Sequence, residues 1–242
     1  MEITPRLAAV ALVVAIALGI AIAAVMTSRD REDREDREGR GEAPGPIRRS
    51  VPYEPVRVAE CITEEECERL IARATPMLKR SKVLGDVVST ARTSEQAWVQ
   101  PADEHVGDVV RKIRARAAHL TGVYREDLFE QLQVARYTPG QQYMPHYDAC
   151  VEDCDRDGRE RVSRRATLLV YLTDDFEEGG THFANIDARF RPARGDGVLF
   201  YNVDADTGAE LPDSLHAGEP VRSGTKWVAN CWVRFDAGAR RV

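Results

Sequence analysis

The second half of the chain, from Phe129 to Phe235, is a succession of short segments with the composition of β-strands. Pro, Gly, Asn and Asp separate them, as is typical of strands joined by tight turns. Two helices are expected before this region, and helices followed by many short strands predict a jelly-roll barrel buttressed by helices on one side. The predicted fold is therefore mainly β with N-terminal helices (α+β). The expected strands are 129–137, 143–149, 166–172, 181–184, 189–191, 197–202, 214–219 and 226–235.

The first expected helix begins at Thr63, which forms a capping box with Glu66. Pro76 is expected to kink or end it, because proline cannot donate the next backbone hydrogen bond. A second helix is expected over 103–120, where apolar residues recur with the helical period and Gly122 can end it.

The N-terminus carries a different signal. Residues 7–26 contain no charge and, as a helix, would match a hydrocarbon core of about 30 Å. A membrane anchor over 1–26 is expected. The alternative is a long signal peptide, for which 21–23 could serve as the cleavage site. A charged linker rich in Gly and Pro follows at 27–50, and the folded domain is expected to cover 51–242.

The orientation of this anchor is ambiguous from charge alone. Only Arg6 precedes it, whereas five arginines follow it among interleaved acids. The positive-inside rule, which counts Lys and Arg, would by itself place the C-terminal side in the cytoplasm. Our expectation is nevertheless a type II protein with a signal-anchor in the endoplasmic reticulum or another secretory-pathway membrane.

Charge and cysteine content exclude some classes of function. The net charge of −6 argues against nucleic acid as a partner, since duplex binding needs a basic surface. The cysteines are odd in number, at five, and form no CxxC pair, so neither a disulfide framework nor a zinc site is expected. Cys150 and Cys154 are either two loop thiols or a pair formed in an oxidising compartment.

The strongest chemical signal lies in one of the expected strands. His146 and Asp148 stand two apart, so in a strand their side chains point to the same face. An imidazole and a carboxylate there supply two thirds of the facial triad that binds non-haem Fe(II) and leaves positions open. His216 is the expected second histidine, and His182 is its rival.

Lys226 lies ten residues beyond His216, in an expected buried strand. A buried ammonium needs an anionic partner. A dicarboxylate cosubstrate would supply one.

Seven motifs occur in the order found in the catalytic domain of the prolyl 4-hydroxylases, and residues 56–235 resemble that family. The resemblance implies a double-stranded β-helix barrel that uses Fe(II), 2-oxoglutarate, O₂ and ascorbate. The motifs are R-T-S at 92–94, L-Q-V-A-R-Y at 132–137, G-Q-Q-Y-M-P-H-Y-D at 140–148, R-A-T-L-L-V-Y-L at 165–172, G-G-T-H-F at 179–183, H-A-G-E-P-V at 216–221 and G-T-K-W at 224–227.

The resemblance also assigns roles to particular residues. It implies Fe(II) ligands at His146, Asp148 and His216, and it makes His182 an outward-facing neighbour of Thr181. The 2-oxoglutarate site would consist of Lys226, Tyr137 and Thr181. The residues that would line the peptide groove are Arg92, Ser94, Glu130, Tyr143, Arg164 and Trp232.

The activity implied by the resemblance is hydroxylation of proline in peptides or proteins, coupled to oxidative decarboxylation of 2-oxoglutarate to succinate and CO₂. Two alternatives remain at this point: the same chemistry on another residue such as lysine, or a catalytically silent barrel that binds proline-rich chains. The loop 149–163 imitates a calcium-binding loop but has Arg164 where a ligating Glu is needed. It is instead expected to be a mobile, charged lid near the metal.

Overall fold

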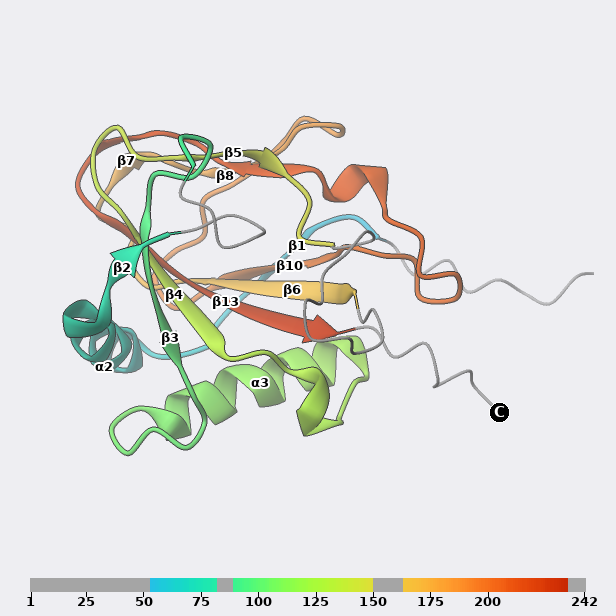
Figure 1. Ribbon diagram of the computed structural model, residues 1–242, viewed down its shortest axis with the longest axis horizontal. Helices are drawn as coiled ribbons and strands as arrows, with labels where there is room; N and C mark the ends of the chain where they lie inside the picture. The colour runs from blue at the N-terminus through green and yellow to red at the C-terminus, as the bar shows by residue number, and fades with distance from the viewer. Residues whose placement is uncertain (1–52, 82–88, 150–162, 235–242) are drawn as a thin grey trace, which may run out of the picture. The chain divides into compact units, whose positions relative to one another are not determined.

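The computed structural model describes residues 53–81, 89–149 and 163–234, all of which belong to one compact unit, Pro52–Val242. Its main layer is a seven-stranded antiparallel sheet (Figure 1). The strand order of this sheet is β1 (Val56–Val58), β10 (Gly197–Tyr201), β6 (Arg164–Tyr171), β13 (Lys226–Arg234), β4 (Leu132–Tyr137), β3 (Glu95–Val99) and β2 (Lys79–Arg80).

A smaller sheet faces the large one and completes the barrel. It contains β5 (Tyr143–His146), β11 (His216–Gly218), β8 (Thr181–Phe183) and β9 (Ala188–Phe190), in that order. β12 (Val221–Ser223) and β7 (Glu177–Glu178) form a separate two-stranded ribbon. The predicted jelly-roll barrel with N-terminal helices is confirmed.

The alternation of side chains along β13 shows how the large sheet serves two cores. Trp227, Ala229 and Cys231 belong to the apolar cluster shared with the helices, whereas Lys226 and Trp232 face a cavity on the opposite side. Because successive side chains of a strand point to opposite faces, one strand can hold both a hydrophobic core and a polar site.

Two helices cover the outer face of the large sheet (Figure 1). Helix α2 (Glu64–Ala74) begins with the predicted capping box: Thr63 Oγ1 accepts from the Glu66 backbone N–H, and Glu66 Oε2 accepts from the Thr63 N–H. Helix α3 (Gly107–Thr121) ends at Gly122, whose φ of 71° lies in the left-handed region that glycine adopts readily. Three short 3₁₀ turns complete the list: η1 (Thr75–Met77), η2 (Glu126–Leu128) and η3 (Pro212–Ser214).

Each of the eight strands expected from the sequence overlaps an observed one, and the described residues form five more strands that were not expected. The additional strands are β1, β2, β3, β7 and β12. Four of them have only two or three residues, too few for a periodic pattern to be visible. The fifth, β3, carries Glu95 and Gln96 beside apolar residues and becomes a strand through its pairing with β4.

The prediction of a membrane anchor, and with it the type II membrane localisation, is corrected here. In the described part of the chain no helix is long and apolar enough to cross a membrane. The longest, α3, has 15 residues, whereas a span needs about twenty apolar ones. Residues 7–26 themselves lie outside the described residues, as do residues 150–162 of the expected lid and the two cysteines within it.

Candidate active site

Strands β5 and β11 place two histidines side by side. They pair so that His146 lies directly opposite His216. Asp148 follows β5 by two residues, and one ligand atom from each of these three side chains lies within 4.8 Å of the others. His182, the rival, points away from this cluster, and its Nε2 lies 3.1 Å from Asp187 Oδ1.

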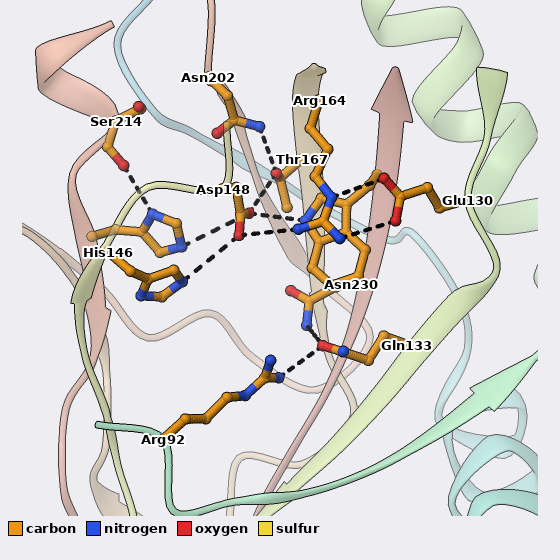
Figure 2. Close-up of polar contacts among 12 residues, drawn as sticks. Arg92, Glu130, Gln133, His146, Asp148, Arg164, Thr167, Asn202, Ser214 and Asn230 are labelled. Carbon is orange, nitrogen blue, oxygen red and sulfur yellow. Dashed lines mark hydrogen bonds and ion pairs between the residues drawn. The ribbon is translucent and has the colours of Figure 1, made fainter. Parts of the chain in front are cut away.

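Backbone carbonyls fix the tautomer of both histidines. His146 Nδ1 lies 2.9 Å from the Met144 carbonyl oxygen, and His216 Nδ1 lies 2.8 Å from that of Ser214. A carbonyl oxygen only accepts, so each Nδ1 carries the proton and donates it. Each Nε2 therefore keeps a free lone pair. His146 Nε2 lies 3.7 Å from Asp148 Oδ1 (Figure 2), and His216 Nε2 lies 3.9 Å from Asp148 Oδ2.

Asp148 is the buried anion of the cluster. Its Oδ2 accepts from Thr167 Oγ1 at 2.7 Å and from Trp232 Nε1 at 2.9 Å. Burial raises the pKa of the Asp148 carboxyl, but the neighbouring His146, His216 and Arg164 outweigh burial, so the pKa lies well below its usual range. The group is ionised at neutral pH.

Burial is the largest cause that lowers the pKa of His216, to about 4. The His216 imidazole is therefore neutral at neutral pH. A neutral imidazole is the form that binds a metal ion.

These residues line one cavity of about 300 Å³. It lies between the concave face of the large sheet and strands β5, β8 and β11 of the small one. Its walls are polar and aromatic, and they combine the predicted metal and cosubstrate residues with others described below. The lining residues are Arg92, Gln96, Trp98, Gln133, Tyr137, Tyr143, His146, Tyr147, Asp148, Arg164, Leu169, Thr181, His216, Gly218, Lys226, Val228, Asn230 and Trp232.

Lys226 supplies the cation of this cavity. Its side chain is 2% exposed, and Nζ donates to the Gly179 carbonyl at 2.6 Å. Burial lowers the pKa of Lys226 to about 7, opposed only in part by Glu219. A carboxylate bound against Nζ would raise it again. The site is thus suited to an anionic ligand.

Two tyrosines and a threonine surround the same ammonium group. The rings of Tyr137 and Tyr171 lie 5.5 Å and 5.2 Å from Lys226 Nζ. The Tyr171 hydroxyl lies 2.7 Å from Thr181 Oγ1, and both groups are buried. Tyr137 and Thr181 were predicted from the sequence, whereas Tyr171 was not.

Four of the six predicted groove residues line the cavity. The guanidinium of Arg92 lies 4.6 Å from the ring centroid of Tyr143, and that ring stacks on His146 with 3.5 Å between centroids. The guanidinium of Arg164 lies 3.6 Å from the ring centroid of Trp232. These side chains bring cations and aromatic faces next to the metal ligands.

The other two lie outside the cavity wall. Ser94 is buried behind Arg92. Its hydroxyl accepts a hydrogen bond from Arg92 Nε at 3.3 Å and donates one to the Ser81 hydroxyl. The Glu130 carboxylate accepts hydrogen bonds from Nε and a terminal nitrogen of Arg164, at 2.9 Å and 3.0 Å. Ser94 and Glu130 therefore support the two arginines and do not face the cavity.

Sequence reasoning missed several site residues. Thr167 and Asn202 lie behind Asp148, and Gln133 joins Arg92 to Asn230 through its side-chain oxygen (Figure 2). Gln133 and Asn230 lie on the cavity face of strands whose period was visible. That alternation, which sends every second residue of 132–137 and 226–234 inward, was the signal that could have found them.

The donor set fits Fe(II) with 2-oxoglutarate. Two imidazole nitrogens and one carboxylate form the ligand set of non-haem Fe(II) oxygenases, and the described residues bring these atoms to one point. A buried lysine in the same cavity meets the need of a dicarboxylate for a cation. Both groups can thus be held by the side chains present.

Comparison with known proteins agrees with this chemistry. The family model described as the 2OG-Fe(II) oxygenase superfamily matches residues 132–234. A crystal structure of the viral collagen prolyl hydroxylase vCPH from Paramecium Bursaria Chlorella virus-1, in complex with 2OG, superposes with a TM-score of 0.60 at 33% identity. That superposition covers 75% of this chain and 96% of the viral chain.

Relatives by sequence come from viruses, plants and animals. Prolyl 4-hydroxylase 1 of Arabidopsis thaliana is 35% identical over 195 residues, which cover 73% of this chain and 67% of the plant protein. A protein of Acanthamoeba polyphaga mimivirus is 34% identical, covering 76% of this chain and 75% of its own length. The match to prolyl 4-hydroxylase subunit alpha-1 of Caenorhabditis elegans, at 32% identity, covers 72% of this chain but only 32% of that subunit. The chain belongs to the prolyl 4-hydroxylase family of Fe(II)- and 2-oxoglutarate-dependent oxygenases.

Proposed function

We propose that this protein hydroxylates proline residues of peptides or proteins at the cavity that contains His146, Asp148 and His216. One observation supports this most: the predicted metal ligands and the buried Lys226 line the same cavity, together with aromatic and cationic side chains. When bound, Fe(II) and 2-oxoglutarate supply activation of O₂, coupled to oxidative decarboxylation of 2-oxoglutarate to succinate and CO₂.

The protein's own contribution is to hold the metal and to orient the cosubstrate. His146, Asp148 and His216 would hold the metal on one face and leave its other face to the cosubstrates. Lys226 would bind the distal carboxylate of 2-oxoglutarate by a charge-assisted hydrogen bond, with Tyr171, Tyr137 and Thr181 around it. We further propose that 51–242 is the catalytic domain, that 27–50 is a linker and that ascorbate is a reductant for the iron.

The groove for the substrate would be formed by residues that line the cavity. Arg92 and Arg164 would offer guanidinium donors to peptide carbonyl groups, and the aromatic side chains of Tyr143 and Trp232 would line the groove beside them. Ser94 and Glu130 would act indirectly, by fixing the two arginines. A silent binding barrel is not favoured, because the complete metal-ligand set is present, and hydroxylation of lysine is not favoured by the relatives.

The activity is tested by incubating the protein with proline-rich peptides, Fe(II), 2-oxoglutarate and ascorbate, followed by mass spectrometry. We expect one oxygen atom to be added to a proline, with succinate formed in equal amount. Omission of 2-oxoglutarate is the control and should give no product. Oxygen on lysine, or none on any peptide that binds, would contradict proline hydroxylation.

Trp98 is proposed to extend the groove beyond the cavity. Its side chain is 37% exposed, its ring lies 5.9 Å from that of Trp232, and it lines both the cavity and an adjoining open hollow of about 480 Å³ with Phe129 and Glu130. A long peptide would reach this hollow, whereas a short one that ends beside the reacting proline would not.

Replacing Trp98 with alanine should therefore raise KM for the long peptide only. An aromatic contact contributes about 0.5–1.5 kcal/mol beyond burial, so KM should rise about two- to tenfold. Trp98→Phe, which keeps an aromatic face, is the matched control and should recover most of the loss. Equal effects on long and short peptides would show that Trp98 does not form a separate subsite.

A further inference from the structure

The two oxygens of Asp148 have different surroundings. Oδ2 accepts two hydrogen bonds, from Thr167 Oγ1 at 2.7 Å and from Trp232 Nε1 at 2.9 Å. Oδ1 faces His146 Nε2 at 3.7 Å and a terminal nitrogen of Arg164 at 4.0 Å, and Oδ2 also lies 3.9 Å from His216 Nε2. A carboxylate oxygen has about two lone-pair directions. Both lone-pair directions of Oδ2 are thus engaged by donors of the protein, while Oδ1 remains directed toward the His146 imidazole.

Asn202 determines where the hydroxyl proton of Thr167 goes. Asn202 Nδ2 donates to Thr167 Oγ1 at 2.9 Å, so the hydroxyl accepts from the amide and gives its own proton to Asp148 (Figure 2). With the amide turned the other way, its oxygen would compete for that proton. Thr167 and Asn202 are completely buried, so water does not compete for these bonds.

The backbone holds this chain of hydrogen bonds in place. Thr167 lies on β6 in register with Phe200 of β10 and with Trp232 of β13, which puts the Thr167 and Trp232 side chains side by side on one face of the sheet. Asn202 follows β10, where its backbone N–H donates to Arg165 and its carbonyl accepts from Leu211. The donors to Asp148 therefore come from the rigid core of the barrel.

Asn202 also has a feature that stability alone does not explain. Its side-chain oxygen is buried, and no hydrogen-bond partner for it occurs among the described residues. An unsatisfied buried polar atom costs roughly 1–3 kcal/mol. Such a residue is usually retained because another of its atoms has a role, and here the amide nitrogen is the atom that bonds Thr167.

We infer that Thr167, oriented by Asn202, is a positioning residue that makes Asp148 a one-oxygen metal ligand. This inference rests on the proposed metal site. A carboxylate that bound through both oxygens would occupy two of six coordination positions, and with two histidines it would leave only two. The cosubstrates need three. By engaging Oδ2, Thr167 and Trp232 would preserve the third position.

The test measures the binding of Co(II), used as a stand-in for Fe(II), by titration calorimetry and visible absorption. Thr167→Val keeps the shape but lacks the hydroxyl. Its dissociation constant for Co(II) should rise about 10–100-fold, the usual effect of losing a hydrogen bond to a metal ligand. The absorption spectrum of bound Co(II) should also change, because the second carboxylate oxygen becomes free to coordinate. Thr167→Ser, which restores a hydroxyl, should return both readouts toward wild type.

Thr121→Val is the matched control, since Thr121 is a buried threonine on α3 whose hydroxyl donates to the Ala117 carbonyl. It should leave Co(II) affinity and spectrum unchanged. Asn202→Leu provides a second route if Thr167→Val folds poorly, and it should weaken Co(II) binding in the same direction. Wild-type affinity and spectrum in both Thr167→Val and Asn202→Leu would overturn the inference. A wild-type protein that binds no Co(II) would instead overturn the proposed function.

Discussion

Replacing His216 with alanine is expected to abolish both metal binding and turnover. Loss of His216 leaves one imidazole and one carboxylate, and two ligands hold a divalent ion poorly. The same result is expected for His146→Ala and Asp148→Ala. Metal affinity should fall by more than the roughly 10–100-fold that loss of a supporting hydrogen bond costs.

The matched control is His182→Ala. His182 is also a histidine on the small sheet, in the strand next to β11, but its Nε2 contacts Asp187 on the outer side. This variant should retain iron and activity. The measurement is iron bound per protein chain after anaerobic loading, together with the rate of 2-oxoglutarate decarboxylation. Iron lost in His182→Ala and kept in His216→Ala would reverse the assignment of the ligand.

Lys226→Ala is expected to lower the apparent affinity for 2-oxoglutarate by about ten- to a few hundredfold. A charge-assisted hydrogen bond contributes about 1.5–3 kcal/mol, and each 1.4 kcal/mol corresponds to roughly tenfold in affinity. Lys226 Nζ is the buried cation against which a distal carboxylate would bind. Iron binding should change little, because Lys226 is not one of the clustered ligands.

The measurement is decarboxylation as a function of 2-oxoglutarate concentration for wild type, Lys226→Ala and Lys226→Arg. Arginine restores a cation but has a longer, planar head group, so it should recover part of the loss if the pocket admits it. Peptide binding without turnover should persist in all three proteins. An unchanged concentration dependence in Lys226→Ala would remove Lys226 from the site and, with it, much of the case for 2-oxoglutarate.

Much of the fold was predictable because its signals are local. The capping box of Thr63 and Glu66, the glycine that ends α3 and the alternation in β4, β6 and β13 depend on residues a few positions apart. The proximity of His146 and Asp148 is equally local, because they are only two positions apart, although Asp148 lies beyond the end of β5. Lys226 was identified by a charge in an otherwise apolar strand, which needs a partner whatever the tertiary arrangement.

The prediction of a membrane anchor was wrong for a different reason. An apolar run of the right length identifies a segment that could cross a membrane, but length and hydropathy do not distinguish such a segment from other apolar sequences. The described helices give no support to a span. Hydropathy was the only signal behind that prediction, whereas the barrel was indicated by several independent ones.

By itself, the sequence determined the class of fold, the candidate metal ligands His146, Asp148 and His216, and the candidate cosubstrate residue Lys226. Only the tertiary structure decided how close these side chains lie to one another, because the register of β11 against β5 places His216, and not His182, opposite His146. It also decided that Ser94 and Glu130 contact Arg92 and Arg164 instead of the cavity. In the same way it decided that Thr167 and Asn202 support Asp148. The physical reason is distance along the chain: these contacts join residues on different strands, and their positions are set by strand register and packing rather than by any local pattern.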